Sequence, residues 1–296
     1  MAIILDHQLR EQIPRDNSEF PITYFHDELA SLPNRAGPLH WHPEFEIASA
    51  TASTLDFQVG HEHIVLNKGD SIFVNGNILH GIRQIGGEAC DPMPNIVFSG
   101  SLIASEASAI NQKYIKPIFS CDSLPYIVFR GENAEHKEIC CLIAQIYQKM
   151  KHMTECYEMT VQRSLSLIFE YIFKNFEAFP KSKASRIQIT AQVRIQKMLS
   201  YIYEHYAEPL TLSDIASAAN ISRSEAGRCF NAYMGCSPIE ALIRYRLETA
   251  QGLLTETRLT VQEISAECGF NSINNFSRQY KKIYGHTPRM QRVLGK

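Results

Sequence analysis

An internal repeat between residues 193 and 293 constrains the fold more than any other feature of the sequence. Its first half pairs residues at an offset of 49: Leu212 with Val261, Ile215 with Ile264, Ala219 with Cys268, and Ile221 with Phe270. Its second half pairs residues at an offset of 50: Arg228 with Arg278, Phe230 with Tyr280, Tyr233 with Ile283, Gly235 with Gly285, and Pro238 with Pro288. Two copies of one structural unit are the simplest explanation.

Each copy reads as a helix, a tight turn and a second helix. Residues 211–214 and 260–263 place a capping hydroxyl three positions before an acid, which is a helix-start signature. In each copy the helical pattern then breaks and restarts at a second cap, which we expect to be Ser222 in the first copy and Asn271 in the second. The sequence therefore predicts two helix-turn-helix units, at about residues 211–233 and 260–284.

The second helix of each unit carries polar side chains suited to the DNA major groove. The DNA-contacting candidates are Ser222, Arg223, Ser224, Glu225, Gly227, Arg228, Asn271, Ser272, Asn274, Asn275, Arg278, Lys281 and Lys282. Arg suits guanine and Asn suits adenine, so Arg228, Arg278 and Asn274 are the expected base readers. Ser222, Asn275, Lys281 and Lys282 are expected to touch phosphates. A solvated helix face is the alternative for any one residue, but the paired arrangement disfavours it.

Between the units, residues 237–254 predict a long, rigid spacer helix. With it, the stretch resembles the DNA-binding domain of the AraC/XylS family of bacterial transcription regulators. The matching residues are 212–216, Ser222, 228–230, Gly235, Pro238, Arg246, Ala250, Leu254, Ile264, 269–270, 276–278, 281–282 and 285–288. Ala226 and Gly227 depart from the family pattern, and a glycine weakens a helix by about 1 kcal/mol. We therefore expect stronger readout from the second unit.

Length and charge agree with a two-domain regulator. The chain has 296 residues, and a domain of about 150 residues is a common size. Residues 191–296 hold 13 Lys and Arg against 9 Asp and Glu, whereas residues 1–190 hold 16 against 22. The basic half is thus the repeat, as nucleic-acid contact requires. No apolar run approaches the roughly 18 residues of a membrane span, and no signal peptide is evident, so a cytoplasmic protein without a membrane partner is expected.

The N-terminal half alternates apolar and polar residues with turn signals between short runs. The expected strands are residues 22–25, 39–48, 55–59, 63–66, 71–74, 78–84, 95–98 and 126–130. Residues 34–38 are expected to be a turn. Many short strands predict a β-barrel or sandwich, so the fold class is α+β in two domains.

A group of histidines and acids lies within these strands. His40, His42, Glu44 and Glu46 alternate and should share one strand face, with Trp41 on the other, and His80 begins a later strand. Residues 37–46 and 69–80 resemble the two motifs of the cupin fold, in which such histidines and a glutamate often hold a divalent metal. His40, His42, Glu46 and His80 are therefore metal candidates and, with Trp41, ligand-binding candidates. Lining of a polar pocket and a plain solvated face are the alternatives.

After the strands, residues 134–177 predict two amphipathic helices. In the family that this chain resembles, such helices pack on the barrel and on a second subunit, which implies a homodimer. An intramolecular hairpin without a partner is the alternative. The predicted domains are a cupin-like sensor over 1–177, a linker over 178–190 and a DNA-binding domain over 191–296.

The sequence thus predicts a regulator that binds double-stranded DNA and is not an enzyme. We expect a small-molecule effector, and the histidine-rich pocket with Trp41 favours a sugar or another polar metabolite. The family resemblance implies the same class, because residues 110–118 are similar to a segment of sugar-responsive AraC-type regulators. RNA polymerase is a further partner that the resemblance implies if the protein is an activator, although the direction of regulation stays open. Two alternatives are a metal-dependent cupin enzyme fused to a DNA-binding domain, and a constitutive DNA-binding protein whose barrel only dimerises.

Overall fold

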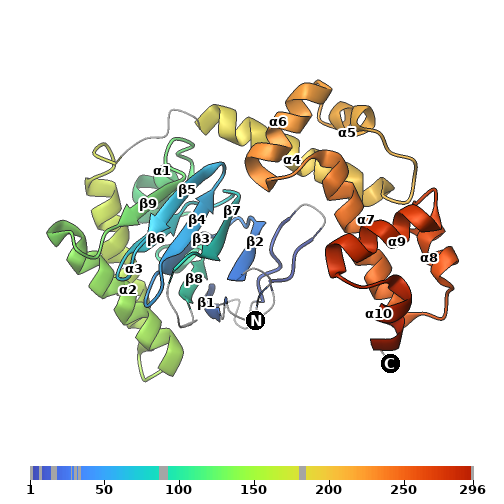
Figure 1. Cartoon of the computed structure of the whole chain (residues 1–296). Helices are drawn as coiled ribbons and strands as arrows, with labels where there is room; N and C mark the ends of the chain where they lie inside the picture. Colours follow the sequence, from blue (N-terminus) through green and yellow to red (C-terminus); the bar gives the residue numbers. More distant parts are fainter. Residues whose placement is uncertain are drawn as a thin grey trace. The chain divides into compact units, whose positions relative to one another are not determined.

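The chain divides into two compact units, Met1–Gln192 and Val193–Lys296 (Figure 1). The structure, a computed structural model, describes residues 3–6, 9–14, 19–27, 29, 32, 35–86, 93–179 and 185–294. The first unit combines antiparallel sheets with helices, and the second is helical throughout. The predicted fold class, α+β in two domains with an N-terminal β domain and an all-helical C-terminal domain, is confirmed.

The described strands of the first unit form two antiparallel sheets. The five-stranded sheet has the order β1 (Ile22–Asp27), β8 (Met93–Phe98), β3 (Phe45–Ser49), β6 (Ser71–Val74) and β9 (Tyr126–Phe129). The four-stranded sheet has the order β2 (Ala36–His40), β7 (His80–Gln84), β4 (Leu55–Val59) and β5 (Glu62–Leu66). Among these residues the two sheets face each other as a sandwich and are not closed into a single ladder. As expected, β9 returns to the sheet of β6.

The prediction of a single strand over residues 39–48 is wrong. The chain instead ends β2 at His40 and begins β3 at Phe45, and the two strands lie in different sheets. Pro43 has no N–H to donate to a ladder. The carbonyl of His42 instead accepts from the backbone N–H of Asn77 at 2.7 Å. The expected turn over 34–38 is also wrong in part, because β2 already begins at Ala36.

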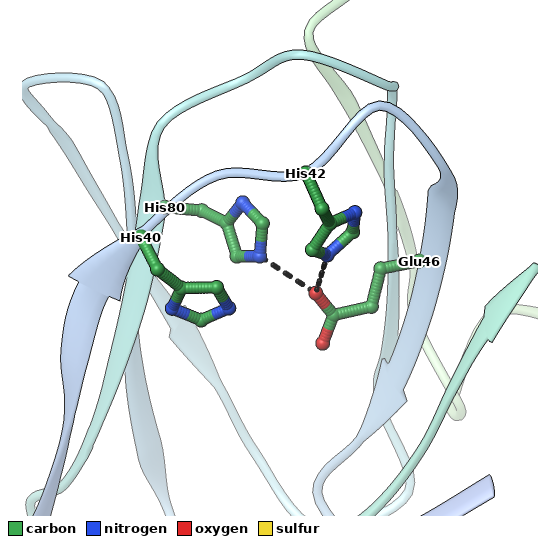
Figure 2. A group of neighbouring side chains, drawn as sticks. All are labelled: His40, His42, Glu46 and His80. Carbon is green, nitrogen blue, oxygen red and sulfur yellow. Dashed lines mark hydrogen bonds and ion pairs between the residues drawn. The ribbon is translucent and has the colours of Figure 1, made fainter. Parts of the chain in front are cut away.

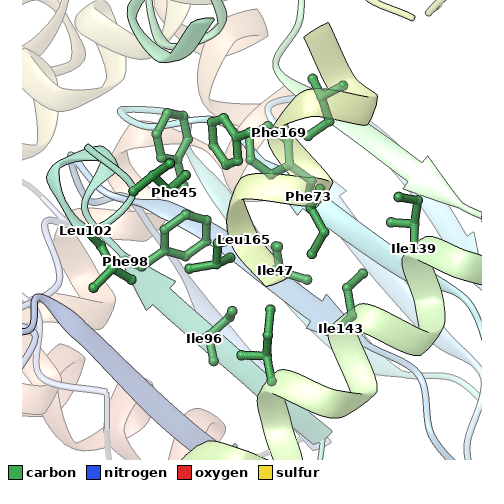
Figure 3. Close-up of a cluster of buried hydrophobic side chains, with 14 of the residues drawn as sticks. Phe45, Ile47, Phe73, Ile96, Phe98, Leu102, Ile139, Ile143, Leu165 and Phe169 are labelled. Atoms are coloured by element: carbon green, nitrogen blue, oxygen red, sulfur yellow. The ribbon is translucent and has the colours of Figure 1, made fainter. Parts of the chain in front are cut away.

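Apolar residues cover the five-stranded sheet on both faces. Helices α2 (Ala134–His152) and α3 (Tyr157–Lys174) bury their apolar stripes against one face (Figure 3). The Phe169 ring lies among Phe45, Phe73 and Phe98, with centroid separations of 5.1, 5.8 and 6.1 Å. The opposite face packs against the four-stranded sheet. Short helical segments also occur among the described residues of this unit, namely η3 (Gly100–Leu102), η4 (Asn111–Ile115) and α1 (Lys116–Phe119).

The second unit contains the two predicted helix-turn-helix motifs. Its helices are α4 (Ser185–His205), α5 (Leu212–Ala218), α6 (Arg223–Met234), α7 (Pro238–Glu256), α8 (Val261–Glu267), α9 (Ile273–Tyr284) and α10 (Pro288–Leu294). Both predicted capping boxes are present, at Thr211 with Asp214 and at Thr260 with Glu263. Helix α4 begins its run before this unit, at Ser185, within the expected linker over 178–190. Residues 180–184 of that linker lie outside the described residues.

Ser222 and Ser272 cap the two second helices at equivalent positions of the repeat. Ser222 caps α6 as predicted, because its hydroxyl accepts from the N–H of Glu225 at 3.2 Å. The prediction that Asn271 caps α9 is wrong. Ser272 is the cap, and its hydroxyl accepts from the N–H of Asn275 at 3.5 Å. Both hydroxyls therefore satisfy backbone donors at the helix start. Among the described residues, no helix has the length and apolar character that crossing a membrane demands.

Arg246 of α7 joins the two motifs of the second unit. Its guanidinium donates to the carbonyl oxygens of Tyr206 and Glu208, each at 2.7 Å, in the segment that precedes the first motif. The guanidinium carbon also lies 5.8 Å from the ring centroid of Phe270, in the turn of the second motif. Charged donors on carbonyls make strong hydrogen bonds, so this residue ties the segment before the first motif to the turn of the second.

Gly269 allows that junction to close. It has a φ of +73°, and a Cβ at this position would lie 2.7 Å from the Tyr206 carbonyl oxygen and 2.8 Å from that of Ala207. We predict that Gly269→Ala lowers the free energy of unfolding by about 2 to 4 kcal/mol, because left-handed backbone and overpacking both penalise the methyl group. Chemical denaturation of the full chain measures this loss.

Gly227 supplies the matched control for that measurement. It lies within α6, and a Cβ there would meet nothing within 4 Å. Gly227→Ala should raise the free energy of unfolding by about 0.5 to 1 kcal/mol. Equal stability of the two alanine variants would contradict the role of Gly269.

Candidate functional site

Helix α9 presents one polar face and buries the other. Phe276 and Tyr280 are fully buried against α7 and α8, which fixes the orientation of the helix. All of the α9 candidates are exposed: Asn271, Ser272, Asn274, Asn275, Arg278, Lys281 and Lys282. The Arg278 guanidinium donates to the Asn275 side-chain oxygen at 3.0 Å. Asn275 therefore orients an arginine that can donate two hydrogen bonds to a base edge.

Helix α6 presents a comparable face with fewer side chains available. Ser222, Arg223, Ser224 and Arg228 are exposed, whereas Glu225 and Gly227 are half-buried. Glu225 accepts a hydrogen bond from Arg194 of α4 at 2.6 Å, and Arg194 was not anticipated from the sequence. No local pattern predicts that pair, because the partners lie on different helices.

Three histidines and a glutamate converge inside the first unit (Figure 2). His40, His42, Glu46 and His80 are all buried, and one ligand atom from each lies within 4.8 Å of the others. His80 Nε2 lies 2.7 Å from Glu46 Oε2, and His42 Nε2 lies 3.4 Å from the same oxygen. The strand break at Pro43 brings the group together, because it carries His40 and Glu46 into facing sheets.

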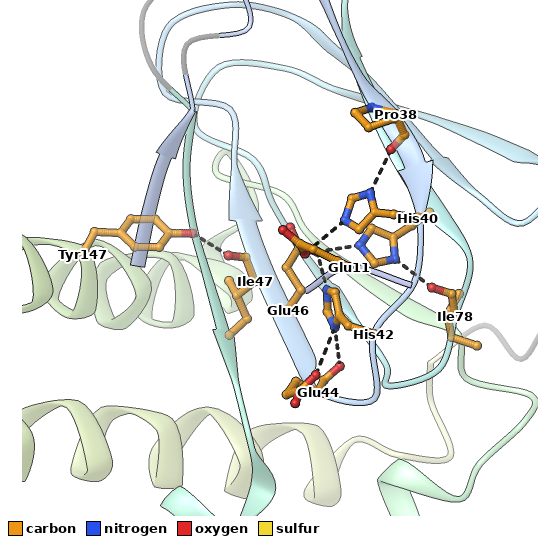
Figure 4. Close-up of polar contacts among 10 residues, drawn as sticks. Glu11, Pro38, His40, His42, Glu44, Glu46, Ile47, Ile78 and Tyr147 are labelled. Atoms are coloured by element: carbon orange, nitrogen blue, oxygen red, sulfur yellow. Dashed lines mark hydrogen bonds and ion pairs between the residues drawn. The ribbon is translucent and has the colours of Figure 1, made fainter. Parts of the chain in front are cut away.

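A backbone carbonyl holds the Nδ1 atom of each histidine (Figure 4). The carbonyls of Pro38, Glu44 and Ile78 lie 2.8, 3.1 and 2.7 Å from the Nδ1 atoms of His40, His42 and His80, respectively. A carbonyl can only accept, so each Nδ1 carries the proton and donates it. In a neutral ring, each Nε2 then points a lone pair into the cluster.

The charges within the cluster follow from its burial. Burial lowers the pKa of His40 to about 3, repulsion from His80 adds to the shift, and attraction to Glu46 opposes it. His40 is therefore neutral at physiological pH. Burial acts to raise the pKa of Glu46, but attraction to His80 and hydrogen bonding with the imidazoles outweigh it and hold the pKa well below its usual range. Glu46 is therefore an ionised carboxylate.

This arrangement fits a divalent metal ion. The buried atoms His80 Nε2 and Glu46 Oε2 lie only 2.7 Å apart. A neutral imidazole that carries its proton on Nδ1 would present a lone pair to this carboxylate oxygen, so the two atoms need a positive charge between them, either a proton or a metal ion. Three imidazole nitrogens and one carboxylate oxygen suit Zn, Fe or Mn, and Nδ1–H donation to a carbonyl is the usual support of a metal-binding histidine.

A cavity of about 90 Å³ adjoins the cluster. His40, Glu46 and His80 belong to its lining, with Glu11, Gln12 and Asn95, and the other lining residues are mainly apolar. His42 is buried in the cluster but does not line the cavity. Trp41, a sequence candidate for the ligand site, also lies outside that lining and instead packs with Arg10, whose guanidinium carbon is 5.6 Å from its ring centroid.

Glu11 and Asn95 lie at this cavity but were not anticipated. Asn95 falls within a predicted strand whose alternation gave no reason to single it out. Glu11 lies in the N-terminal segment, outside both cupin-like motifs. Its oxygen Oε2 approaches His40 Nε2 to 3.6 Å. Only the folded chain brings these residues to the histidines.

The comparisons with known proteins agree with the helical motifs. A family described as "Helix-turn-helix domain" matches residues 215–292. An uncharacterised HTH-type transcriptional regulator of Bacillus subtilis, YdeC, is 28% identical over 290 residues, covering 96% of each chain. The lactose operon transcription activator of Staphylococcus xylosus is 26% identical over 159 residues, which cover 54% of this chain and 55% of that protein. A solved AraC-type regulator structure from Chromobacterium violaceum is 31% identical, with a TM-score of 0.34, covering 36% of this chain and 96% of the other.

We expect the histidine cluster to bind one divalent cation per chain. Protein stripped with a chelator and then given Mn²⁺ or Zn²⁺ should recover one ion and unfold at a higher temperature, because only the folded state assembles the ligands. His80→Ala should abolish both effects. His63→Ala is the control, because His63 is exposed on β5 and pairs with Asp56 outside the cluster. Uptake by the His80 variant at wild-type stoichiometry would contradict the expectation.

Proposed function

Because this chain carries the helix-turn-helix domain of AraC-family transcription regulators, we propose that α6 and α9 read two successive major grooves of its operator and that a small molecule in the N-terminal cavity controls this binding. The observation that carries the proposal is the pair of similarly capped helices, each with one buried face and one exposed polar face. The rigid α7 would keep them about one helical turn apart, roughly 34 Å.

Within this interface, Arg228, Arg278 and Asn274 are the proposed base readers. Arg278 is the strongest of them, because Asn275 already holds its guanidinium. Ser222, Ser272 and Asn275 lie at helix N-termini, where phosphates bind readily. Lys281 and Lys282, in the last turn of α9, would add phosphate contacts. Glu225 and Gly227 leave α6 with fewer reading groups, so the second motif would contribute more of the specificity.

Substitutions of Arg278 and Lys282 distinguish base reading from phosphate contact. Arg278→Ala should weaken specific binding by about 1 to 3 kcal/mol and relax preference at one base pair, because a bidentate contact is lost. Lys282→Ala should weaken binding to all sequences about equally and reduce its salt dependence. Gel-shift titrations on matched and mismatched operators measure both. Equal loss on every duplex for Arg278→Ala would rule out its reading role.

The effector that we propose is a sugar or a related polar metabolite. Its hydroxyl groups would meet the polar lining residues His40, Glu46, His80 and Asn95. The similarity to a lactose operon activator supports the same class. Binding would shift the population between arrangements of the chain that differ in affinity for DNA.

We propose that the regulator acts as a homodimer through α2 and α3. Most of their apolar stripes already pack within the unit, so the partner would meet the residues left exposed: Met153, Met159 and Leu167. RNA polymerase would be a further partner if the bound protein activates transcription. A monomer of unchanged size at all concentrations would favour the intramolecular hairpin instead.

A metal-dependent cupin enzyme is the second candidate, and the converging His40, His42, Glu46 and His80 favour it. It differs from the regulator in one measurable respect. An enzyme would turn over a metabolite and lose that turnover with its metal, whereas a regulator would bind the metabolite unchanged and alter its affinity for DNA.

A thermal-shift screen of metabolites tests the sensor. A ligand at about 100 times its Kd should stabilise the chain by about 2.7 kcal/mol. Asn95→Ala should reduce the shift, because it removes a polar group from the cavity wall, and His63→Ala should leave it unchanged. If no metabolite, sugars included, shifts the unfolding temperature while operator binding persists, the constitutive alternative is correct.

A further inference from the structure

Backbone hydrogen bonds join residues 9–11 to Trp41, beside the histidine cluster. The Glu11 N–H donates to the Trp41 carbonyl at 2.9 Å, and the Trp41 N–H donates to the Leu9 carbonyl at 3.0 Å. Arg10 and Trp41 form a parallel bridge and stack through the guanidinium. Because Trp41 directly follows His40, these bonds fix residues 9–11 next to one of the proposed metal ligands.

This attachment directs the Glu11 carboxylate into the cluster (Figure 4). Its oxygen Oε2 lies 3.6 Å from His40 Nε2, and its side chain is only 7% exposed, as is that of Glu46. Both carboxylates line the cavity with His40 and His80. Glu11 therefore lies beside His40, where the cluster borders the cavity.

The donor atoms of the whole group suit a divalent cation. Two buried carboxylates face three imidazoles whose Nδ1 atoms lie against backbone carbonyls, which leaves the Nε2 atoms directed at the cluster. Imidazole nitrogens and carboxylate oxygens are the ligands that hold divalent metal ions in proteins, and a buried carboxylate is stable where it is paired or coordinates a metal.

We propose that Glu11 is a fifth ligand, which turns the His40, His42, Glu46 and His80 group into a site with three nitrogen and two oxygen donors. Five donors exceed the tetrahedral set that zinc prefers and suit Mn²⁺, Fe²⁺ or Co²⁺. Because Glu11 belongs to the N-terminal segment, the bound cation also holds residues 9–14 against the cavity. The inference rests on the metal site described above and is independent of DNA binding.

The test compares the wild-type chain with Glu11→Gln, Glu46→Gln and Glu19→Gln, in which an acid becomes an amide of the same size. Glu19 is an exposed acid of the same N-terminal region and serves as the control. Calorimetry with Mn²⁺ gives the affinity, and the visible spectrum of added Co²⁺ reports the coordination number. Hydrogen exchange of residues 9–14, with and without Mn²⁺, reports the segment.

Glu11→Gln should bind Mn²⁺ at least tenfold more weakly, at unchanged stoichiometry, because four ligands remain. Its Co²⁺ spectrum should become more intense, as the coordination number falls, and Mn²⁺ should no longer slow exchange in residues 9–14. Glu19→Gln should match the wild-type chain in all three measurements.

Two outcomes would overturn the proposal, and they are distinguishable. Wild-type affinity and exchange in Glu11→Gln, with metal lost in Glu46→Gln, would remove Glu11 from an otherwise valid site. No uptake of Mn²⁺ or Co²⁺ by the wild-type chain would remove the site itself. Operator binding by the wild-type chain in the same preparation would show that the proposed function stands in either case.

Discussion

The guanidinium of Arg246 makes the interaction on which the DNA-binding unit depends. It ties the carbonyls of Tyr206 and Glu208 to the turn that contains Phe270, and Gly269 lets these segments meet. Two recognition helices can read neighbouring grooves only if their separation is fixed, because DNA presents its grooves at a fixed repeat. The stiffness of α7 alone would not supply this constraint. It also needs the bonds that anchor each motif to α7.

Strand β3 plays the corresponding part in the first unit. Successive residues of a strand point to opposite faces, so Glu46 enters the histidine cluster while Ile47 enters the core beneath α2 and α3. The carbonyl of Ile47 accepts from the buried Tyr147 hydroxyl of α2 at 3.1 Å (Figure 4). The ligand cluster and the helical layer thus share one strand. A change in the position of Glu46 would therefore also move Ile47 and its contacts with α2 and α3, the helices proposed to dimerise.

Local chemistry could be predicted from the sequence, and contacts between distant segments could not. The boxes at Thr211 and Thr260 depend on residues three apart, so their pattern is visible in the chain. The histidine and glutamate types at the cluster were also predictable, but the break at Pro43 that brings them together was not. Asn271 and Ser272 are both good caps, and only the backbone conformation distinguishes them. Glu11, Arg194 and Tyr147 act through partners on other elements, which no periodicity reveals.

Hydroxyl-radical footprinting of the full chain on promoter DNA of its own genome tests the central claim most directly. Two recognition helices on one rigid spacer predict, for each chain, two protected windows on one face of the duplex, about 10 base pairs apart. The protection should weaken steeply as salt rises, because phosphate contacts release counterions. A single protected window for each chain, or no salt-sensitive protection of any duplex, would contradict the account.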